Sequence, residues 1–469
     1  QATTTADTGG VARGEWVLGP TAFSQKAQAS IPGAAPVRFT GWAATAIQAL
    51  SGSGEMARAG VTLTVSALLT NGGVRVPDVQ VRWQVTSGGG SVTPAVSRSG
   101  AQPQQGVATA QWTLGPALGT QTLTATAGAL QATFTATVVN GGGRVLVAQV
   151  PGRVLDADGG RVLWRDDSGA TRVLKVRTLA TGADQVVDGP AGWTPTRGRL
   201  VAGGAVVADS TASGFELHEW LGGTRVALGP ARDWAVDGEW LAWSTQTRML
   251  RRNLPSRATL VVAEAQVDRR FESVSVDANG HMAWTESGNL WLFRGTAKEL
   301  VTELMLPNIH TNVTGPVIDG ANVVYGSFDA AFDWTAITLL HPAGHEFLME
   351  PVHYRSGGTR IVGRETEYQA EGGWVAFVRY LDATATRAPV WRRSPAGDLQ
   401  RLSGDDTVGQ LEALGADGSV VFQVGSRRFL SVAGGPQYDA GAVAADERVV
   451  WHAGRFFLLA GGSVYEIAP

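Results

Sequence analysis

Residues 273–303, SVSVDANGHMAWTESGNLWLFRGTAKELVTE, contain four short runs in which apolar and polar residues alternate. The runs are SVSVD, HMAWTE, NLWLFR and KELVTE, and turn-forming residues separate them. Alternation with a period of two lets a β-strand bury one face and leave the other in water. The stretch therefore predicts four β-strands joined by turns, which together form one structural repeat.

The second of these strands recurs along the chain from about residue 144. In each copy, a turn containing Asp, Asn or Gly precedes a short apolar strand that usually ends in an aromatic residue. The copies are DGGRVLW (158–164), DGEWLAW (237–243), NGHMAW (279–284), DGANVVY (319–325), GGWVAF (372–377), DGSVVF (417–422) and DERVVW (446–451), with GGAVVA (203–208) as a degenerate eighth member.

The spacing of these copies predicts the architecture. The first and last turns, near residues 159 and 446, are seven intervals apart, so the mean period is 41 residues. A period of about 40 residues with several strands in each repeat is typical of a β-propeller. We predict an all-β propeller of about eight four-stranded blades over residues 144–469. Seven blades stay open if the short last repeat merges with its neighbour or with 144–150, a candidate closing strand.

The repeat resembles the blades of TolB-like and WD40-like propellers through its D-G-x-x-[hydrophobic]-x-[aromatic] turn and strand. Trp164, Trp243, Trp284 and Trp451 occupy the last position of this pattern. An aromatic residue that returns in every blade is expected to pack between blades. The Asp residues of the turns are interpreted as turn formers, because Asp tolerates left-handed backbone and caps nearby peptide groups.

Residues 60–139 carry a different pattern. They include VQVRWQVTSGGG (79–90) and WTLGPALGTQTLTA (112–125). The whole segment resembles the bacterial Ig-like domain of the invasin and intimin type, also called Big-1-like. The resemblance implies a β-sandwich of the kind that is stacked in tandem as a stalk on bacterial surfaces.

Part of this domain is repeated near the start of the chain. GVARGEWVLGPTA (10–22) and GVATAQWTLGPAL (106–118) agree at seven of 13 positions, with an offset of 96 residues. We therefore predict the C-terminal half of an Ig-like domain over 1–45, a linker over 46–59 and a complete Ig-like domain over 60–140. Half a sandwich exposes its inner face, so we expect upstream residues to complete it, with strands from another chain as the alternative.

Composition limits the classes of function. The 469 residues carry a net charge of −3, which gives no footprint for nucleic acid, and contain no Cys, which excludes disulfides. Residues 99–143 are uncharged but rich in Thr, Gln and Gly, so they do not predict a transmembrane segment. We expect a secreted protein, located at the cell surface or in the periplasm or outer envelope of a bacterium.

Two groups of side chains are candidate sites. His341, His345 and His353 lie with two Glu residues in LLHPAGHEFLMEPVHY (339–354), and His341 and His345 flank a tight turn where a metal could bind. Four Trp residues outside the blade pattern are candidates for ligand binding by ring stacking, namely Trp193, Trp234, Trp334 and Trp391. No cofactor is predicted, and calcium or a transition metal stays open.

Recognised catalytic motifs such as G-x-S-x-G and H-E-x-x-H do not occur in the sequence. We therefore predict a non-catalytic protein in which Ig-like modules present a propeller that binds another envelope or surface protein, a surface polysaccharide or a neighbouring subunit. A propeller hydrolase or lyase acting on polysaccharide is one alternative, which acidic and aromatic residues converging on the propeller axis would favour. A structural subunit of a surface layer or filament is the other.

Overall fold

The computed structural model describes residues 5–12, 24–31, 33–100, 105–169, 172–187, 193, 195–212, 214–265, 270–301, 311–329, 334–353, 367–381, 387–405 and 407–469. Within these ranges every regular element is a β-strand, so the all-β prediction is confirmed. These residues include no helix with the length and apolar character needed to cross a membrane. The chain divides into two compact units, residues 1–139 and residues 140–469.

The first unit is built from two sheets and a separate hairpin. The first sheet has the order β3-β5-β10-β8, with β6 beside β5, and the second contains β12-β11-β7-β9, with β4 beside β12. The strands are β1 (Ser24–Ala29), β2 (Val37–Trp42), β3 (Ala46–Ser51), β4 (Glu55–Arg58), β5 (Thr62–Asn71), β6 (Val74–Arg75), β7 (Gln80–Ser87), β8 (Gly90–Thr93), β9 (Val96–Arg98), β10 (Val107–Leu114), β11 (Gly119–Ala127) and β12 (Leu130–Gly141).

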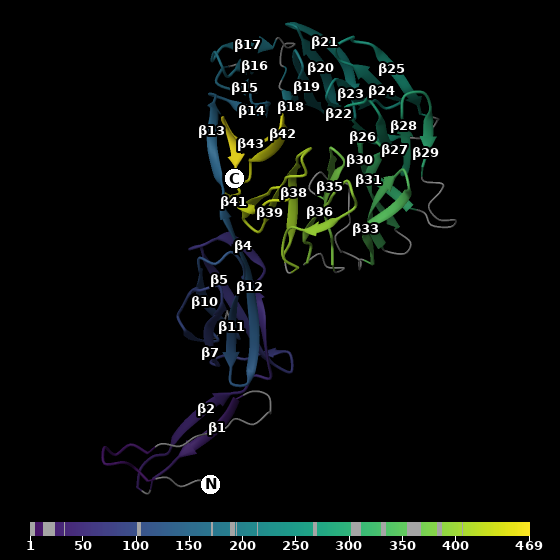
Figure 1. Ribbon diagram of the computed structural model, residues 1–469. Coiled ribbons are helices and arrows are strands. Elements are labelled where there is room, and N and C mark those ends of the chain that lie inside the picture. Colours follow the sequence, from purple (N-terminus) through teal and green to yellow (C-terminus); the bar gives the residue numbers. More distant parts are fainter. Residues whose placement is uncertain are drawn as a thin grey trace. The chain divides into compact units, whose positions relative to one another are not determined.

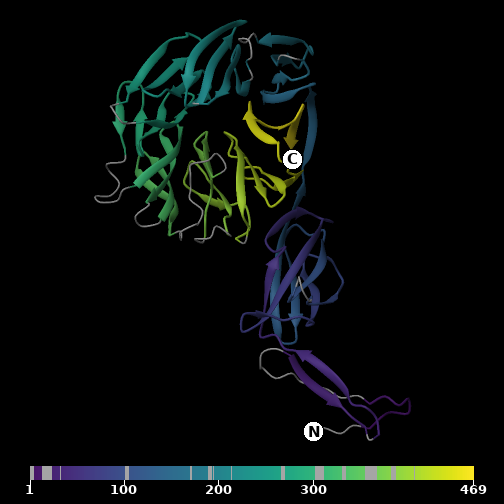
Figure 2. The same cartoon turned by 180° about the vertical axis from the view of Figure 1, so that it is seen from behind.

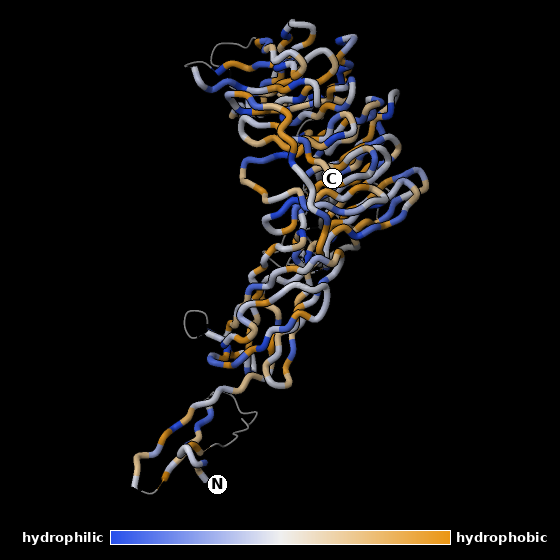
Figure 3. Tube along the Cα trace, turned by 60° about the vertical axis from the view of Figure 1, so that its left-hand side comes forward, coloured by the Kyte–Doolittle hydropathy of each residue, from blue (hydrophilic) through white to orange (hydrophobic). Residues whose placement is uncertain are grey.

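The two sheets pack face to face as a β-sandwich. Alternate residues of β7, β10 and β12 point inward, and the core includes Trp112 from the first sheet and Leu123 and Phe134 from the second, all with 0% exposure. Figure 3 shows the same alternation, because the tube changes between orange and blue over short intervals. This is the pattern expected of strands that bury one face and hydrate the other.

The predicted linker over 46–59 is wrong, because this stretch supplies two strands of the sandwich. Strand β3 pairs antiparallel with β5, and β4 pairs parallel with β12. Met56 and Ala57 on β4 are buried, with exposed fractions of 1% and 0%. The Gly and Ser residues between the two strands, in SGSG (51–54), suggested a flexible connection, but they form the turn that carries the chain from one sheet to the other.

The hairpin β1–β2 repeats the hairpin β11–β12 in both sequence and register. Ala27 pairs with Phe39 in the first hairpin, and Leu123 pairs with Phe134 in the second. The internal repeat aligns these pairs within one residue, since Ala27 lies 96 residues before Leu123 and Phe39 lies 95 residues before Phe134. Their environments differ: Phe134 is fully buried in the sandwich, whereas Phe39 is 51% exposed.

The second unit contains eight sets of four consecutively paired strands in its described part, which we number as blades; seven of them are separate four-stranded sheets, and the set β38–β41 belongs to a larger sheet. Blade 1 comprises β14 (Arg153–Ala157), β15 (Arg161–Asp166), β16 (Val173–Thr178) and β17 (Asp184–Val187), and blade 2 comprises β18 (Pro195–Val201), β19 (Gly204–Thr211), β20 (Gly214–Leu221) and β21 (Thr224–Ala231). Blade 3 comprises β22 (Asp233–Asp237), β23 (Trp240–Ser244), β24 (Arg248–Asn253) and β25 (Thr259–Glu264), and blade 4 comprises β26 (Phe271–Val276), β27 (Met282–Glu286), β28 (Asn289–Phe293) and β29 (Lys298–Leu300).

Blades 5 to 7 follow in chain order, and blade 8 combines both ends of the unit. Blade 5 comprises β30 (Thr311–Asp319), β31 (Asn322–Asp329), β32 (Trp334–His341) and β33 (Gly344–His353), and blade 6 comprises β34 (Tyr368–Glu371), β35 (Trp374–Val378), β36 (Val390–Arg393) and β37 (Leu399–Arg401). Blade 7 comprises β38 (Gly409–Leu414), β39 (Val420–Val424), β40 (Arg427–Ser431) and β41 (Gln437–Ala442), and blade 8 comprises β42 (Arg448–His452), β43 (Arg455–Ala460), β44 (Ser463–Ala468) and β13 (Gly143–Gln149).

The blades form a closed ring, visible from both sides in Figures 1 and 2. Apolar cores join neighbouring blades, such as the cluster that packs Ala242 and Met249 of blade 3 against Trp284 of blade 4. A further cluster joins Trp164 of blade 1 to Phe457 of blade 8 and so closes the ring. The unit is therefore a β-propeller, and its eight blades agree with the predicted number.

Strand β13 provides the predicted closure, since it pairs antiparallel with β44 as the outermost strand of blade 8. One detail of the predicted repeat is wrong. Trp451 lies on β42, the first strand of its blade, whereas the other pattern aromatics lie on second strands. The second strand of blade 8 is β43, where Phe456 and Phe457 are buried. The turn equivalent to the other anchors is therefore Ala453-Gly454, which explains the short last spacing.

Candidate functional site at one end of the propeller axis

The first strands of the blades bring seven titratable side chains toward one end of the propeller axis. Each residue lies at, near or directly after the C-terminal end of a first strand. We call this set the axial cluster; it consists of Asp156 (β14), Arg199 (β18), Asp237 (β22), Asp277 (after β26), Asp319 (β30), Glu371 (β34) and His452 (β42).

Hydrogen bonds between successive blades show that these strand ends lie at the same end of the ring. The backbone N–H of Leu200 in blade 2 donates to Asp156 of blade 1 at 2.7 Å. The N–H of Gly320 in blade 5 donates to Asp277 of blade 4 at 3.0 Å. In the same way, Gly373 of blade 6 donates to Asp319 of blade 5. The carboxylate of one blade therefore holds the turn of the next.

Asp277 shows how fully such a carboxylate can be satisfied. It is 2% exposed, and it accepts the N–H groups of Asn279 and His281 as well as that of Gly320. The Nδ1 atom of His281 lies 2.9 Å from its other oxygen. A buried carboxylate with this many donors is stabilised where it lies, so Asp277 has a structural role between blades 4 and 5.

Asp156 forms a second kind of arrangement, with a histidine and an arginine as its side-chain neighbours. Its side chain is completely buried, with His452 Nε2 at 3.4 Å and Arg199 Nη1 at 3.8 Å. Burial alone would raise the pKa of Asp156, but His452, Arg199 and the N–H of Leu200 lower it below its usual value. Asp156 is therefore ionised, and the imidazole of His452 lies beside it.

Glu371 and Asp237 differ from these satisfied carboxylates. Burial and the negative charges of Asp237 and Asp319 raise the pKa of Glu371 to about 7, although His452 opposes the shift. Burial and the charges of Asp277 and Asp319 likewise raise the pKa of Asp237. Glu371 of blade 6 thus interacts with groups on blades 3, 5 and 8, which places it near the axis. Near pH 7 it exchanges a proton readily.

The axial cluster can perform two kinds of chemistry. Carboxylates that raise each other's pKa bind a cationic group favourably, because its charge relieves their repulsion. A carboxyl group with a pKa near 7 can also act as a general acid or base. The sequence pattern contained Asp237 and Asp319 in its D-G turns, but it indicated only turn formation. Their convergence depends on closure of the ring, which no local pattern encodes.

The predicted metal ligands lie on the outer part of blade 5. His341 and His345 flank the β32–β33 turn, and they line a pocket of about 220 Å³ together with Arg294 and Glu299 of blade 4. The Nδ1 atom of His341 accepts the N–H of Ala343 at 3.3 Å.

His345 Nδ1 lies 3.4 Å from the hydroxyl of Tyr325, and burial together with the charge of His341 lowers the pKa of His345. His353 pairs with Trp334 through the backbone of β32 and β33, and both side chains lie outside the described residues. Among the residues that are described, no group of three or more His, Asp and Glu side chains is arranged to hold a metal ion. The three-histidine site stays a prediction.

Three of the predicted ligand-binding Trp residues pack in the cores between blades. Trp193 is 7% exposed and its ring meets the imidazole of His218 edge-on at 5.2 Å. Trp234 and Trp391 are partly buried against the blade 2–3 and blade 5–6 cores. The guanidinium of Arg379 lies 5.7 Å from the ring centre of Trp391. The structure does not bring these three side chains together at one place, and ligand binding by them stays a prediction.

No protein-family model and no curated protein matches this chain. Among solved structures, it is similar to dipeptidyl peptidase 4 of Porphyromonas gingivalis, with 9% identity, a TM-score of 0.48, and coverage of 66% of this chain and 56% of the peptidase. It is also similar to a prolyl endopeptidase, with 11% identity, a TM-score of 0.42, and coverage of 67% and 54%.

A third similar structure is an uncharacterised protein of Listeria monocytogenes, with 10% identity, a TM-score of 0.36, and coverage of 66% of this chain and 99% of that one. The chain spans little more than half the length of the two peptidase chains. The assignment of the propeller rests on the sheets and their order, and similarities at this level carry no conclusion about activity.

Proposed function

We propose that this chain is a secreted or surface-exposed bacterial protein in which Ig-like modules act as a spacer and the propeller binds a partner of the cell envelope. Residues 60–139 support the first part, since their resemblance to invasin-type Ig-like domains agrees with the two-sheet sandwich. The propeller supports the second part, because its turns present side chains from many blades at one end of the axis.

One observation carries the choice of ligand. Asp237, Asp319 and Glu371 come from three different blades; besides burial, the charge of Asp319 raises the pKa of both Asp237 and Glu371, and the charge of Asp237 raises that of Glu371. A positively charged group placed among them would relieve this repulsion and favour the ionised carboxylates. The ligand is therefore a basic segment of another envelope or surface protein, presented as a Lys or Arg side chain.

The test is calorimetric titration of the full chain with hexalysine at low ionic strength near pH 7. We expect binding that weakens with salt and that releases protons, which shows as a heat that depends on the ionisation enthalpy of the buffer. Glu371→Gln should weaken binding about tenfold, the effect of losing one close charge pair.

Glu272→Gln is the matched control, since Glu272 is exposed on a first strand outside the axial cluster. It should bind hexalysine like the unchanged protein. Absence of binding at low salt, or equal weakening by both substitutions, would remove the axial cluster as the ligand site.

A second candidate function is a propeller enzyme acting on polysaccharide. It is favoured by Glu371, whose pKa of about 7 suits a general acid, and by the ionised Asp156. The charge of His452 acts on both carboxyl groups and lowers the pKa of each. The test is release of new reducing ends from neutral and amino-sugar polysaccharides. A rate that falls by about 10²- to 10⁴-fold in Glu371→Gln would support this function, and release that is absent or unaffected by Glu371→Gln would reject it.

A further inference from the structure

Strand β13 closes the ring with little apolar burial, since only Val147 and Ala148 pack, partly buried, against the core between blades 8 and 1. None of its seven residues is buried, and Val145 and Leu146 are 56% and 54% exposed. Its antiparallel ladder with β44 is interrupted by a register shift between Leu146 and Ala148. Backbone pairing of an exposed strand contributes little stability without buried side chains. Another interaction must therefore hold this strand in place.

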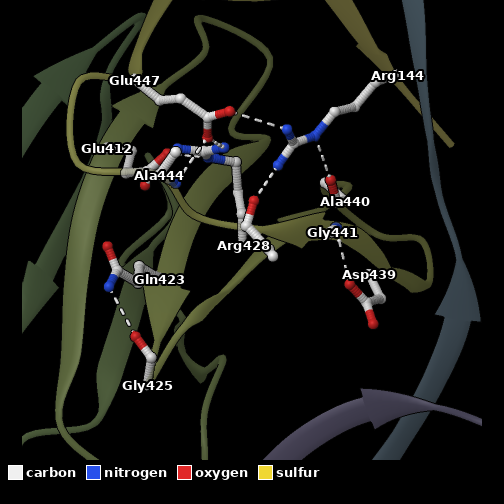
Figure 4. Close-up of polar contacts among 11 residues, drawn as sticks. Arg144, Glu412, Gln423, Gly425, Arg428, Asp439, Ala440, Gly441, Ala444 and Glu447 are labelled. Carbon is white, nitrogen blue, oxygen red and sulfur yellow. Dashed lines mark hydrogen bonds and ion pairs between the residues drawn. The ribbon is translucent and has the colours of Figure 1, made fainter. Parts of the chain in front are cut away.

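The side chain of Arg144, near the start of β13, supplies that interaction (Figure 4). Its Nε donates to the carbonyl of Ala440 at 2.8 Å, and its Nη2 donates to the carbonyl of Ala442. Its Nη1 donates to Glu447 Oε1 at 3.0 Å. One guanidinium therefore binds the end of β41 in blade 7 and the segment that leads into blade 8.

A buried ion network fixes Glu447 for this contact. Arg428 of blade 7 is completely buried, pairs with Glu412 through two hydrogen bonds, and donates Nη1 to Glu447 Oε2 at 2.8 Å. The backbone N–H of Ala444 also donates to Glu447. Burial would raise the pKa of Glu447, but these donors and Arg144 lower it. The carboxylate is thus a charged and oriented acceptor for Arg144.

The backbone around this contact is shaped to admit the guanidinium. Gly441 has a φ of +99°, a backbone conformation that favours glycine, and a Cβ on Gly142 would lie only 3.0 Å from the Cβ of Tyr438 and 3.2 Å from the carbonyl oxygen of Asp439. Gly142 donates its N–H to the carbonyl of Asp439, and Gly441 donates to the carboxylate of the same residue. These glycines let β13 enter close beside β41, where Arg144 reaches three acceptors.

We propose that β13 is a strap that detaches while the remaining blades stay folded, and that Arg144 is the latch that keeps it closed. The strap has a polar latch and few apolar contacts, so its opening costs less free energy than opening a buried strand. When it opens, it uncovers the backbone edge of β44, which then accepts water or another strand. This inference is independent of the proposed ligand.

The test is hydrogen exchange of the full chain, followed by mass spectrometry of peptides from β13, β44 and the buried strand β39. In the unchanged protein, we expect β13 and β44 to exchange faster than β39. Arg144→Gln should speed exchange of β13 and β44 by about 10- to 100-fold, the effect of losing one or two charge-assisted hydrogen bonds. Exchange of β39 should not change.

Arg455→Gln is the control, because Arg455 lies in the same blade, on strand β43, and its hydrogen bond with Glu466 is exposed. It should leave exchange of β13 within about twofold. If Arg144→Gln fails to fold, 1 M salt on the unchanged protein replaces it and should speed exchange of β13 selectively. The proposal would be overturned if β13 exchanged at the rate of β39, or if Arg144→Gln changed the exchange of β13 by no more than Arg455→Gln does.

Discussion

Carboxyl groups at equivalent strand ends of this propeller differ according to their hydrogen-bond donors. Asp277 is 2% exposed, yet four donors from two blades surround it. Glu371 is partly buried, and its pKa rises to about 7 because burial and then the charges of neighbouring carboxylates oppose its ionisation. The first residue is therefore part of the scaffold, and the second is the group through which a ligand or a change of pH can act.

The pKa of Glu371 predicts how its replacement changes stability with pH. The folded pKa of about 7 exceeds the unfolded value of 4.5, so ionisation of Glu371 costs the folded state free energy as pH rises through this window. Glu371→Gln removes that cost. We expect a gain of roughly 1–2 kcal/mol at pH 8, discounted for partial exposure, and none at pH 4.

Urea unfolding at both pH values measures this difference, with Glu272→Gln as the exposed control. A gain that is equal at pH 4 and pH 8 would show that Glu371 does not titrate abnormally in the folded state.

The joint between blades 4 and 5 predicts a large cost for removing its carboxylate. Asp277→Ala leaves the buried N–H of Gly320 and two N–H groups of its own turn without an acceptor. We expect a loss of about 2–4 kcal/mol from the unfolding free energy of the propeller. Asp417→Ala should cost about 1 kcal/mol, because Asp417 binds only Ser419 of its own turn in the described contacts. Equal costs would contradict the role of Asp277 between blades.

At the scale of elements, the two hairpins of the first unit have similar sequences but different environments, so equivalent substitutions in them should have different effects on stability. Phe134→Ala should destabilise the sandwich by about 3–5 kcal/mol, since Phe134 is completely buried. Phe39→Ala removes the equivalent residue of the repeat, which is 51% exposed, and should cost less than about 1 kcal/mol. Denaturant unfolding of both variants makes the comparison. A large cost at Phe39 would mean that its face of the hairpin is covered in solution.

The sequence was informative about elements that repeat and uninformative about what the repeats bring together. Trp164, Trp284 and Phe422 were predicted as packing residues, and each is buried on a second strand. Trp451 matched the same local pattern but lies on a first strand, because blade 8 takes its last strand from the other end of the unit. Strands β3 and β4 were missed because their Gly and Ser turn resembles a linker.

The axial cluster could not be predicted, for a related reason. Its members lie up to 296 residues apart, and the two that the repeat pattern contained, Asp237 and Asp319, have a sufficient local explanation as turn formers. Their common environment arises only when eight blades close around one axis, so it depends on long-range packing.

At the scale of the whole molecule, the separate cores of the two units predict two thermal transitions. Residues 1–139 and 140–469 are distinct compact units, and the sandwich core draws all its members from the first. Phe134→Ala should therefore lower the temperature of one calorimetric transition, and Asp277→Ala that of the other. A single transition shifted by both substitutions would show that the units unfold cooperatively.

The closing strand also places a demand on synthesis. Gln149, the last residue of β13, pairs with Ser463, which is synthesised 314 residues later. At about 5–20 residues per second, translation leaves β13 without its partner for roughly 15–60 s. A nascent chain in this state offers an unpaired backbone to any neighbouring polypeptide. Cells that produce this protein must therefore shield one short strand for most of the time that its propeller takes to be made.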